Sequence, residues 1–262
     1  MQTAALDALG LGGEWTYEAM EVSPAELGEL VRSLPERGFA GVNVTIPHKE
    51  AALELADDAS SAAREIGAAN TLSFEGGRIA AENTDAPGLL AALPREPRDL
   101  RALVLGAGGS ARAVVWALGG GGAQVDVWNR TAERADELVR DLAAAAADSA
   151  DDAPRLAPVS AEQARSGDYG LVVNCTAVGL ADGAGDPFES LPLDADRLGQ
   201  GVTLIDLVYG HRDTELVRQA RELGAEVVDG VEILVRQGAE SLRIWTGREA
   251  PLDVMRDAAR RG

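Results

Sequence analysis

Residues 101–122 have the sequence RALVLGAGGSARAVVWALGGGG. An apolar run of strand type enters a glycine-rich turn, and an apolar segment of helical length follows and ends at further glycines. In this context the glycines let the backbone approach a dinucleotide pyrophosphate, and the helix start offers free N–H groups to it. We therefore predict that Gly106, Gly108, Gly109 and Ala111, which takes the third glycine position, hold a pyrophosphate. The alternative is a purely structural turn.

The end of the next expected strand, QVDVW at 124–128, indicates which dinucleotide binds. NAD sites usually have Asp or Glu at this point to bind the ribose hydroxyl. Here Asn129, Arg130 and Thr131 stand there instead, and Arg134 follows one helical turn later. Since a guanidinium matches the geometry of a 2′-phosphate, the segment favours NADP. The alternative is that both arginines are solvated charges at a helix start.

The chain on both sides of this stretch predicts an α/β protein of two domains. Beyond residue 101, strand-like segments such as GLVVNCT at 170–176 and VTLIDLVY at 202–209 alternate with helical ones. Such alternation is typical of a parallel, doubly wound Rossmann-type sheet. A charged, proline-containing break, PREPRD at 94–99, indicates a domain boundary.

The segment before that break predicts a smaller α/β domain. WTYEAMEV at 15–22 alternates as a strand does, and GVNVTIP at 41–47 is rich in β-formers. Residues 70–85, NTLSFEGGRIAAENTD, have the pattern of a hairpin that turns at two glycines.

Lys49 follows the strand at 41–47. It is the only lysine of the chain, since the rest of the 24 lysine and arginine residues are arginine. A proton-transferring amine would resist replacement by arginine, which cannot release its proton. Asp85, at the end of the hairpin, could hold that amine. The alternatives are a surviving surface lysine, an N-cap role for Asp85 and a turn-forming role for Asn70.

Composition excludes several classes of protein. The net charge is −19, with 43 acidic and 24 basic residues, which argues against nucleic-acid binding. Apolar runs are too short for a membrane-spanning helix. Cys175 is the only cysteine, so no internal disulfide can form, and a cytoplasmic location is expected. The sequence shows no metal-binding motif. An acidic, lysine-poor chain also suggests a high-salt habitat.

Motifs spread over nearly the whole chain resemble, in order, those of the shikimate dehydrogenase family. They are NVTIPHK at 43–49, AANTL at 68–72, NTDAPG at 83–88, GAGGSAR at 106–112, WNRT at 128–131, NCTAVGL at 174–180, DLVY at 206–209 and DGVEILVRQGA at 229–239.

The resemblance implies an NADP-dependent reduction of 3-dehydroshikimate to shikimate in aromatic amino-acid biosynthesis. It implies a substrate-binding domain at 1–93, with helices of 237–262 packed back on it, and an NADP-binding domain at 99–236. The implied catalytic pair is Lys49 and Asp85. The implied substrate-binding residues are Thr45, Asn70, Tyr209 and Gln237. The implied cofactor-binding residues are Gly106, Gly108, Gly109, Ala111, Asn129, Arg130, Thr131 and Arg134, with Val178 and Gly230 near the nicotinamide. The expected partner is the small-molecule substrate, and the chain would act as a monomer or homodimer.

One departure concerns the start of the chain. The family normally begins with a strand and a serine-rich loop that binds the substrate carboxylate, whereas Met1 here stands in what resembles the helix after that loop. We therefore expect weak or no activity for the chain as given and recovery in an extended form. The alternatives are a quinate/shikimate dehydrogenase, a methylene-tetrahydrofolate dehydrogenase, which shares the two-domain plan, and a non-catalytic NADP-binding relative.

Overall fold

The computed structural model describes residues 1–146, 153–180, 185–208, 210 and 213–261. They divide into two compact units, of which the first comprises Met1–Gly88 with Val235–Gly262 and the second comprises Leu89–Leu234. Both boundaries fall inside helices, namely α5 (Asp85–Ala92) and α11 (Gly230–Thr246). Among the described residues, no helix combines the length and apolar character that crossing a membrane requires.

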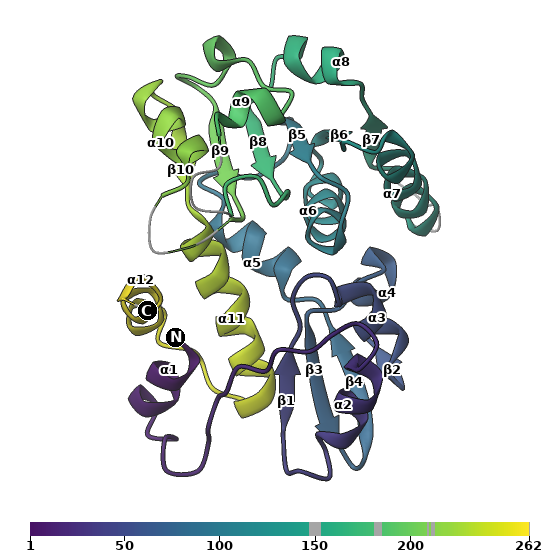
Figure 1. The fold of residues 1–262 in the computed structure, drawn as a ribbon, viewed down its shortest axis with the longest axis vertical. Helices are drawn as coiled ribbons and strands as arrows, with labels where there is room; N and C mark the ends of the chain where they lie inside the picture. The colour runs from purple at the N-terminus through teal and green to yellow at the C-terminus, as the bar shows by residue number, and fades with distance from the viewer. Residues whose placement is uncertain (147–152, 181–184, 209, 211–212, 262) are drawn as a thin grey trace. The chain divides into compact units, whose positions relative to one another are not determined.

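The second unit is built on a six-stranded parallel sheet in the order β10-β9-β8-β5-β6-β7 (Figure 1). The strand order reverses between β5 and β8, which makes this edge the topological switch point of a Rossmann-type sheet. The predicted α/β class with such a sheet is confirmed. Its elements are β5 (Arg101–Leu105), α6 (Gly109–Gly120), β6 (Gln124–Trp128), α7 (Ala132–Ala145), β7 (Arg155–Pro158), α8 (Ala161–Ser166), β8 (Leu171–Asn174), α9 (Pro187–Ser190), the 3-10 turn η1 (Ala195–Arg197), β9 (Thr203–Asp206), α10 (Glu215–Glu222) and β10 (Glu226–Val228).

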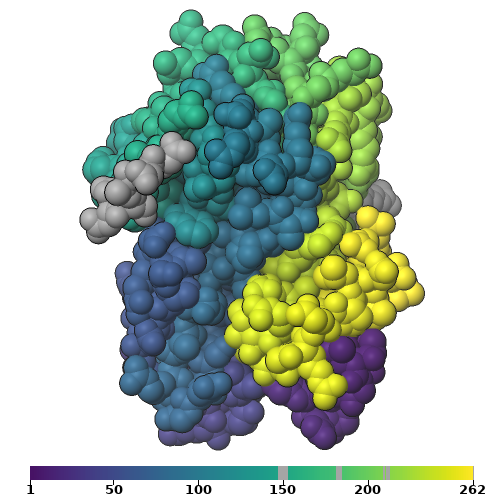
Figure 2. All heavy atoms as spheres, turned by 180° about the vertical axis from the view of Figure 1, so that it is seen from behind, coloured from purple at the N-terminus to yellow at the C-terminus, as the bar shows by residue number. Residues whose placement is uncertain are grey.

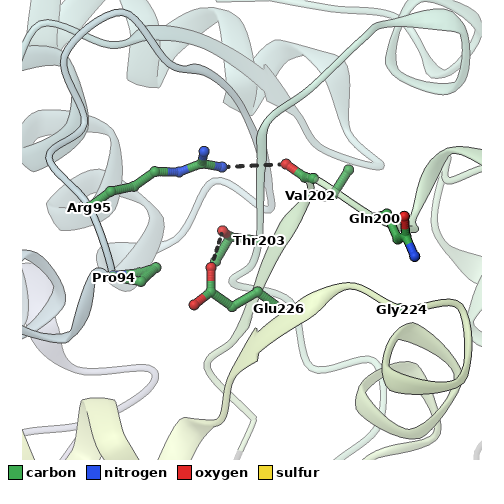
Figure 3. Close-up of a pocket in the computed structure, with 8 residues that line it drawn as sticks. Pro94, Arg95, Gln200, Val202, Thr203, Gly224 and Glu226 are labelled. Atoms are coloured by element: carbon green, nitrogen blue, oxygen red, sulfur yellow. Dashed lines mark hydrogen bonds between the residues drawn. The ribbon is translucent and has the colours of Figure 1, made fainter.

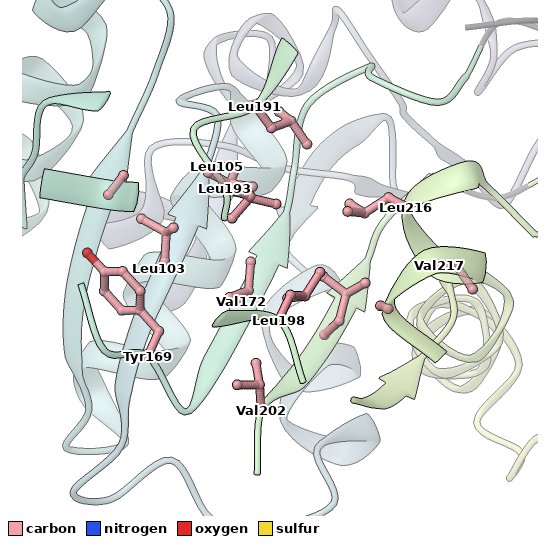
Figure 4. Packing of buried hydrophobic residues seen from close by; sticks show 13 residues of the cluster. Leu103, Leu105, Tyr169, Val172, Leu191, Leu193, Leu198, Val202, Leu216 and Val217 are labelled. Carbon is pink, nitrogen blue, oxygen red and sulfur yellow. The ribbon is translucent and has the colours of Figure 1, made fainter. Parts of the chain in front are cut away.

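The inner strands of this sheet are apolar along most of their length because helices cover them. Four of the five residues of β5 and all four residues of β8 and β9 are buried. Figure 4 shows part of the resulting core, to which β5, β8 and α10 contribute Leu103, Val172 and Leu216. Burial of such side chains is the main stabilising contribution to the unit.

The first unit has a four-stranded mixed sheet in the order β1-β3-β4-β2. The predicted hairpin pairs β3 with β4 in antiparallel register around Gly76 and Gly77, both of which have positive φ. Besides parts of α5 and α11, the unit contains α1 (Gln2–Ala8), α2 (Leu27–Ser33), β1 (Gly41–Asn43), α3 (Lys49–Glu54), β2 (Asp58–Ala59), α4 (Ser61–Ile66), β3 (Thr71–Glu75), β4 (Arg78–Glu82) and α12 (Leu252–Arg261).

The two ends of the chain pack together within the first unit. Helices α1 and α12 are in contact, and Figure 2 shows the terminal segments side by side. Gly238 of α11 lies close to both, because a Cβ there would come within 2.6 Å of Met1 Cε and 3.6 Å of Met255 Cε. A larger residue at 238 would therefore displace the flexible end of the Met1 side chain.

The prediction of a strand at residues 15–22 is wrong. The structure assigns no regular element there, and most of these side chains are exposed. An alternating pattern produces a strand only where a neighbouring strand supplies ladder hydrogen bonds. Within the described part of the chain, this segment is instead attached through side chains, with Tyr17 Oη donating to Asn43 Oδ1 over 3.0 Å.

Candidate functional site

A buried ion pair joins two helix starts in the first unit. Lys49, the first residue of α3, donates from Nζ to Oδ2 of Asp85, the first residue of α5, over 2.6 Å. Only 10% and 9% of the two side chains are exposed. The carbonyl of Lys49 also accepts from the Ala69 N–H over 2.8 Å, which ties the start of α3 to the segment before β3. Because an unpaired charge would be costly at this depth, each partner constrains the other.

Asn70 connects this pair to the surrounding polar groups. Its Nδ2 lies 2.9 Å from Asp85 Oδ1, so both carboxylate oxygens accept hydrogen bonds. The same nitrogen lies 3.2 Å from Gln237 Oε1 of α11. The other end of the amide, Oδ1, accepts from the Thr84 N–H over 2.7 Å. The structure thus brings together four of the predicted site residues: Lys49, Asp85, Asn70 and Gln237.

Ser241, one helical turn after Gln237, fixes α11 against the sheet of this unit. The residue is fully buried, and its hydroxyl oxygen lies 2.8 Å from Asn43 Nδ2, 2.8 Å from Thr71 Oγ1 and 3.2 Å from Thr84 Oγ1. Sequence reasoning missed this cluster. The available signal was a serine among the apolar positions of α11, four residues from Gln237.

The N-cap interpretation of Asp85 is wrong, because Asp85 stands inside α5. The side chain of Asn83 performs the capping instead: its Oδ1 accepts from the N–H groups of Asp85 and Ala86 over 3.1 and 3.2 Å. Its Nδ2 donates to the Ala68 carbonyl over 2.9 Å. Because Asn83 accepts from the N–H groups at the helix start, both oxygens of the Asp85 carboxylate accept from Lys49 and Asn70.

In the second unit, the glycine turn joins the end of β5 to the start of α6. Gly106 has a φ of +107°, and a Cβ there would come within 3.1 Å of the Cys175 carbonyl oxygen, so both conformation and space require glycine. Gly108 is the N-cap of α6 and makes no side-chain cap bond, and a Cβ there would meet nothing within 4 Å. Gly109 opens the helix, and Ala111 is fully buried within it. The turn therefore presents accessible backbone and a helix N-terminus.

The residues after β6 stand at the start of α7. Asn129 Nδ2 donates to the Thr131 carbonyl over 2.8 Å, which closes a turn ahead of the helix. Arg130, Thr131 and Arg134 are exposed, and no ion pair found among the described residues engages either arginine. This end of the sheet thus offers two cationic side chains and no carboxylate at the position after β6.

The other predicted site residues make no described contact with the Lys49–Asp85 cluster. Thr45 is exposed in the turn before α3, where its carbonyl accepts from the His48 N–H. Val178 is half-buried in the loop after β8. Gly230 is buried at the start of α11, where a Cβ would come within 2.6 Å of the Val208 carbonyl oxygen. Tyr209 lies outside the described residues.

A hollow of about 280 Å³ lies at the edge of the parallel sheet where strands β9 and β10 begin (Figure 3). Its lining includes Thr203 and Glu226, the first residues of β9 and β10, and Arg95, whose guanidinium donates to the Gly170 carbonyl over 3.1 Å. Because parallel strands end together, this hollow is at the edge opposite to Gly106. It includes none of the predicted site residues.

A second buried carboxylate, Asp206, ends β9 and was also missed by sequence reasoning. It is fully buried and accepts hydrogen bonds from Asn174 Nδ2, the Val208 N–H and Thr214 Oγ1. Desolvation raises the pKa of Asp206 above its usual range, although these three donors act in the opposite direction.

Comparisons with known proteins assign the chain to a family. Residues 1–72 match the model described as shikimate dehydrogenase substrate binding domain, and residues 230–260 match the shikimate 5′-dehydrogenase C-terminal domain. The NADP(+) shikimate dehydrogenase of Symbiobacterium thermophilum is 41% identical over 99% of this chain and 87% of that protein. The Methanopyrus kandleri protein of the same name is 40% identical over 98% and 88%.

Solved structures give the same result. Shikimate 5-dehydrogenase from Thermus thermophilus, in complex with NADP(H) and shikimate, superposes with a TM-score of 0.83 at 40% identity, and the match covers 99% of this chain and 92% of that one.

The raised pKa of Asp206 predicts a pH dependence of stability. The pKa of Asp206 is higher in the folded state than the unfolded value of about 3.9. Protonation of Asp206 therefore adds to the free energy of unfolding at low pH, and this contribution is lost as the pH rises through the folded-state pKa. Asp206→Asn does not titrate, so between pH 4 and pH 7 (roughly the range above the unfolded value) the stability of the wild type should fall relative to that of the variant. Urea denaturation of both proteins across this range measures the difference. Parallel stability curves would contradict the assignment.

Proposed function

The chain belongs to the shikimate dehydrogenase family, and we propose that it is an oxidoreductase that reduces 3-dehydroshikimate to shikimate with NADPH. The observation that supports this most directly is the buried Lys49–Asp85 pair, with Nζ 2.6 Å from Oδ2. A ketone that accepts hydride needs a proton donor for its oxygen, and a held ammonium can supply that proton. The relatives described above are shikimate dehydrogenases by name and ligand, and we assign the same role, in aromatic biosynthesis in the cytoplasm, to this chain.

Lys49 is the proposed proton donor in the reductive direction. NADPH supplies the hydride, which adds to the carbonyl carbon as the carbonyl π bond moves onto oxygen. The ammonium of Lys49 transfers one proton to that oxygen, becomes a neutral amine and regains a proton from solvent. Asp85 holds the ammonium through Oδ2, while Asn70 holds Oδ1. The ion pair thereby keeps Nζ at one position before transfer.

Amide groups next to the pair suit a polyhydroxylated substrate. Asn70 and Gln237 lie 3.2 Å apart through Nδ2 and Oε1, and both belong to the same polar cluster as Asp85. Primary amides offer both donors and acceptors, as ring hydroxyl groups require. We assign substrate hydroxyls to Asn70, Gln237 and the exposed Thr45, and the substrate carboxylate to Tyr209. In the domain division that follows, residues 1–93 with 237–262 bind substrate, and residues 99–236 bind NADP.

The residues of the second unit fit NADP. The glycine turn leaves the N-terminus of α6 without a side-chain cap, so its N–H groups suit a pyrophosphate. Gly106, Gly108, Gly109 and Ala111 would hold that group. Asn129, Arg130, Thr131 and Arg134 would hold the 2′-phosphate, since a cationic fork rather than a carboxylate follows β6. Val178 and Gly230 would lie near the nicotinamide. Binding of NADP(H) is also named for the Thermus thermophilus structure.

The proposed role of Lys49 predicts a large loss of turnover on its replacement. We expect Lys49→Ala to lower kcat for NADPH oxidation with 3-dehydroshikimate by roughly 10²- to 10⁴-fold relative to the wild type, the usual contribution of a positioned proton donor. Lys49→Arg is the matched variant, because it keeps a cation beside Asp85 but cannot release its proton. It should lose comparable activity while its circular dichroism spectrum stays that of the wild type.

Two results would count against this assignment. A Lys49→Arg enzyme with kcat near that of the wild type would show that charge alone suffices. A wild type that binds NADPH but turns over neither 3-dehydroshikimate nor, in reverse, shikimate and quinate would instead be a non-catalytic NADP-binding protein.

The 2′-phosphate assignment predicts a change in cofactor preference. Arg130→Ala and Arg134→Ala should each lower kcat/KM for NADPH by roughly 10- to 100-fold, since hydrogen bonds to a charged group are lost, and leave kcat/KM for NADH unchanged. Arg140→Ala is the control, because Arg140 is exposed further along α7. Equal losses with NADPH and NADH would place the arginines away from the 2′-phosphate.

A further inference from the structure

Asp206 is a fully buried carboxylate without a cation partner among the described residues. Three donors from three segments converge on it. Asn174 Nδ2, at the end of β8, lies 2.9 Å from Oδ1, and the Val208 N–H lies 3.1 Å from the same oxygen. Thr214 Oγ1 donates to Oδ2 over 2.6 Å. Burying a carboxylate costs desolvation free energy, so an apolar residue would be more stable at this position if it only filled the core.

Asn174 extends the network into the loop after β8. Its Oδ1 accepts from the Thr176 N–H over 3.1 Å and from the Thr176 hydroxyl over 2.7 Å. Thr176 Oγ1 then accepts from the Val178 N–H over 3.1 Å, and Asn174 Nδ2 also lies 3.3 Å from the Val178 carbonyl. The backbone from 174 to 178 is therefore held by side chains that are themselves held by Asp206.

Val208, which follows β9, is fixed from two sides. Asp206 accepts from the Val208 N–H, and Gly230 packs so closely on the Val208 carbonyl that a Cβ would stand 2.6 Å from its oxygen. Thr214, the third donor to Asp206, is the N-cap of α10 and accepts from the Val217 N–H over 3.2 Å. Asp206 thus joins the residues directly after β8, Val208 and the start of α10.

The sheet topology indicates which part of a dinucleotide these loops face. In this fold a dinucleotide lies across the switch point, with its pyrophosphate at the first glycine turn and its adenosine at the end of the second strand. Here the switch point lies between β5 and β8, and the adenosine side is β6. The nicotinamide end therefore falls on the side of β8 and β9, whose carboxyl ends are Asn174 and Asp206.

We propose that Asp206 is a positioning residue that holds residues 174–178, from the end of β8, and 207–208, after β9, in the shape that orients the nicotinamide ring for hydride transfer. This inference rests on the proposed function. Asp206 acts only through Asn174, Val208 and Thr214 and takes no part in proton transfer.

Variants at Asp206 separate positioning from folding. Asp206→Ala removes all three acceptor contacts, and we expect it to lower kcat with NADPH by roughly 10- to 100-fold, as small misplacements of reacting groups do. The primary isotope effect on kcat with NADPH deuterated at the transferred hydrogen should rise, because hydride transfer becomes slower relative to release steps. Asp206→Asn keeps one acceptor oxygen for Asn174 and Val208 and lets Thr214 accept instead of donate. It should restore kcat to within about 3-fold of the wild type, a change of under one kcal/mol.

A fragment of the cofactor provides the control for global damage. The Kd of 2′,5′-ADP, which contains only the adenosine end, should change less than about 2-fold in Asp206→Ala, because no contact to that end is altered. Asp126→Ala is the matched variant: Asp126 is a buried carboxylate of β6 that accepts from Arg101 and Tyr169. It should reduce stability without raising the isotope effect.

If Asp206→Ala fails to fold, Thr176→Val tests the same link, because it removes the hydroxyl between Asn174 and Val178. It should shift kcat and the isotope effect in the same direction. The proposal is overturned if the variant that folds shows an unchanged isotope effect, or if its binding of 2′,5′-ADP weakens as much as its binding of NADPH. Absence of wild-type turnover would count against the proposed function alone, and the ratio of the NADPH and 2′,5′-ADP Kd values would still decide this inference.

Discussion

The buried ion pair between Lys49 and Asp85 is the constraint around which the polar cluster of the first unit is arranged. Two charges removed from water need both each other and further hydrogen bonds, or the desolvation penalty exceeds the attraction. The fold meets this requirement at the ends of three elements. A strand end leads into α3, the hairpin end leads into α5 with Asn83 as its cap, and Asn70 supplies the second hydrogen bond to the carboxylate. Ser241 then fixes α11, so that Gln237 joins the same cluster.

The described residues of the second unit meet a similar requirement at Asp206 with neutral donors. Asp206 stays buried because an amide, a backbone N–H and a hydroxyl surround it, and desolvation raises its pKa. The two carboxylates thus have different proposed roles. In the proposed mechanism Asp85 holds the group that donates a proton, whereas Asp206 holds backbone. Their environments differ accordingly, since among the described residues an ammonium faces Asp85 and neutral donors face Asp206.

Local patterns in the sequence predicted the parts of the structure that local physics determines. The strand–glycine–helix stretch at 101–122 identified the parallel sheet, and the isolated lysine drew attention to position 49, where the structure shows a buried amine. One prediction and one alternative interpretation were wrong because they depended on neighbours. Residues 15–22 alternate but lack a ladder partner among the described residues, and Asp85 stands inside its helix because Asn83 caps it. Ser241 could not be predicted, since its partners Asn43 and Thr71 stand 198 and 170 residues away in the chain. Asp206 was also hidden, because its contact with Asn174 comes from the pairing of β8 with β9.

The central claim is that Lys49 and Asp85 act as one unit in proton transfer, and a double-mutant cycle on kcat tests it most directly. Lys49→Ala, Asp85→Ala and the double variant would be compared with the wild type in the reduction of 3-dehydroshikimate. If the two residues act together, the double variant should have a kcat within about 3-fold of that of the slower single variant, far from the product of the two losses. A double variant whose loss equals that product would show that the two side chains act independently, contrary to the proposed mechanism.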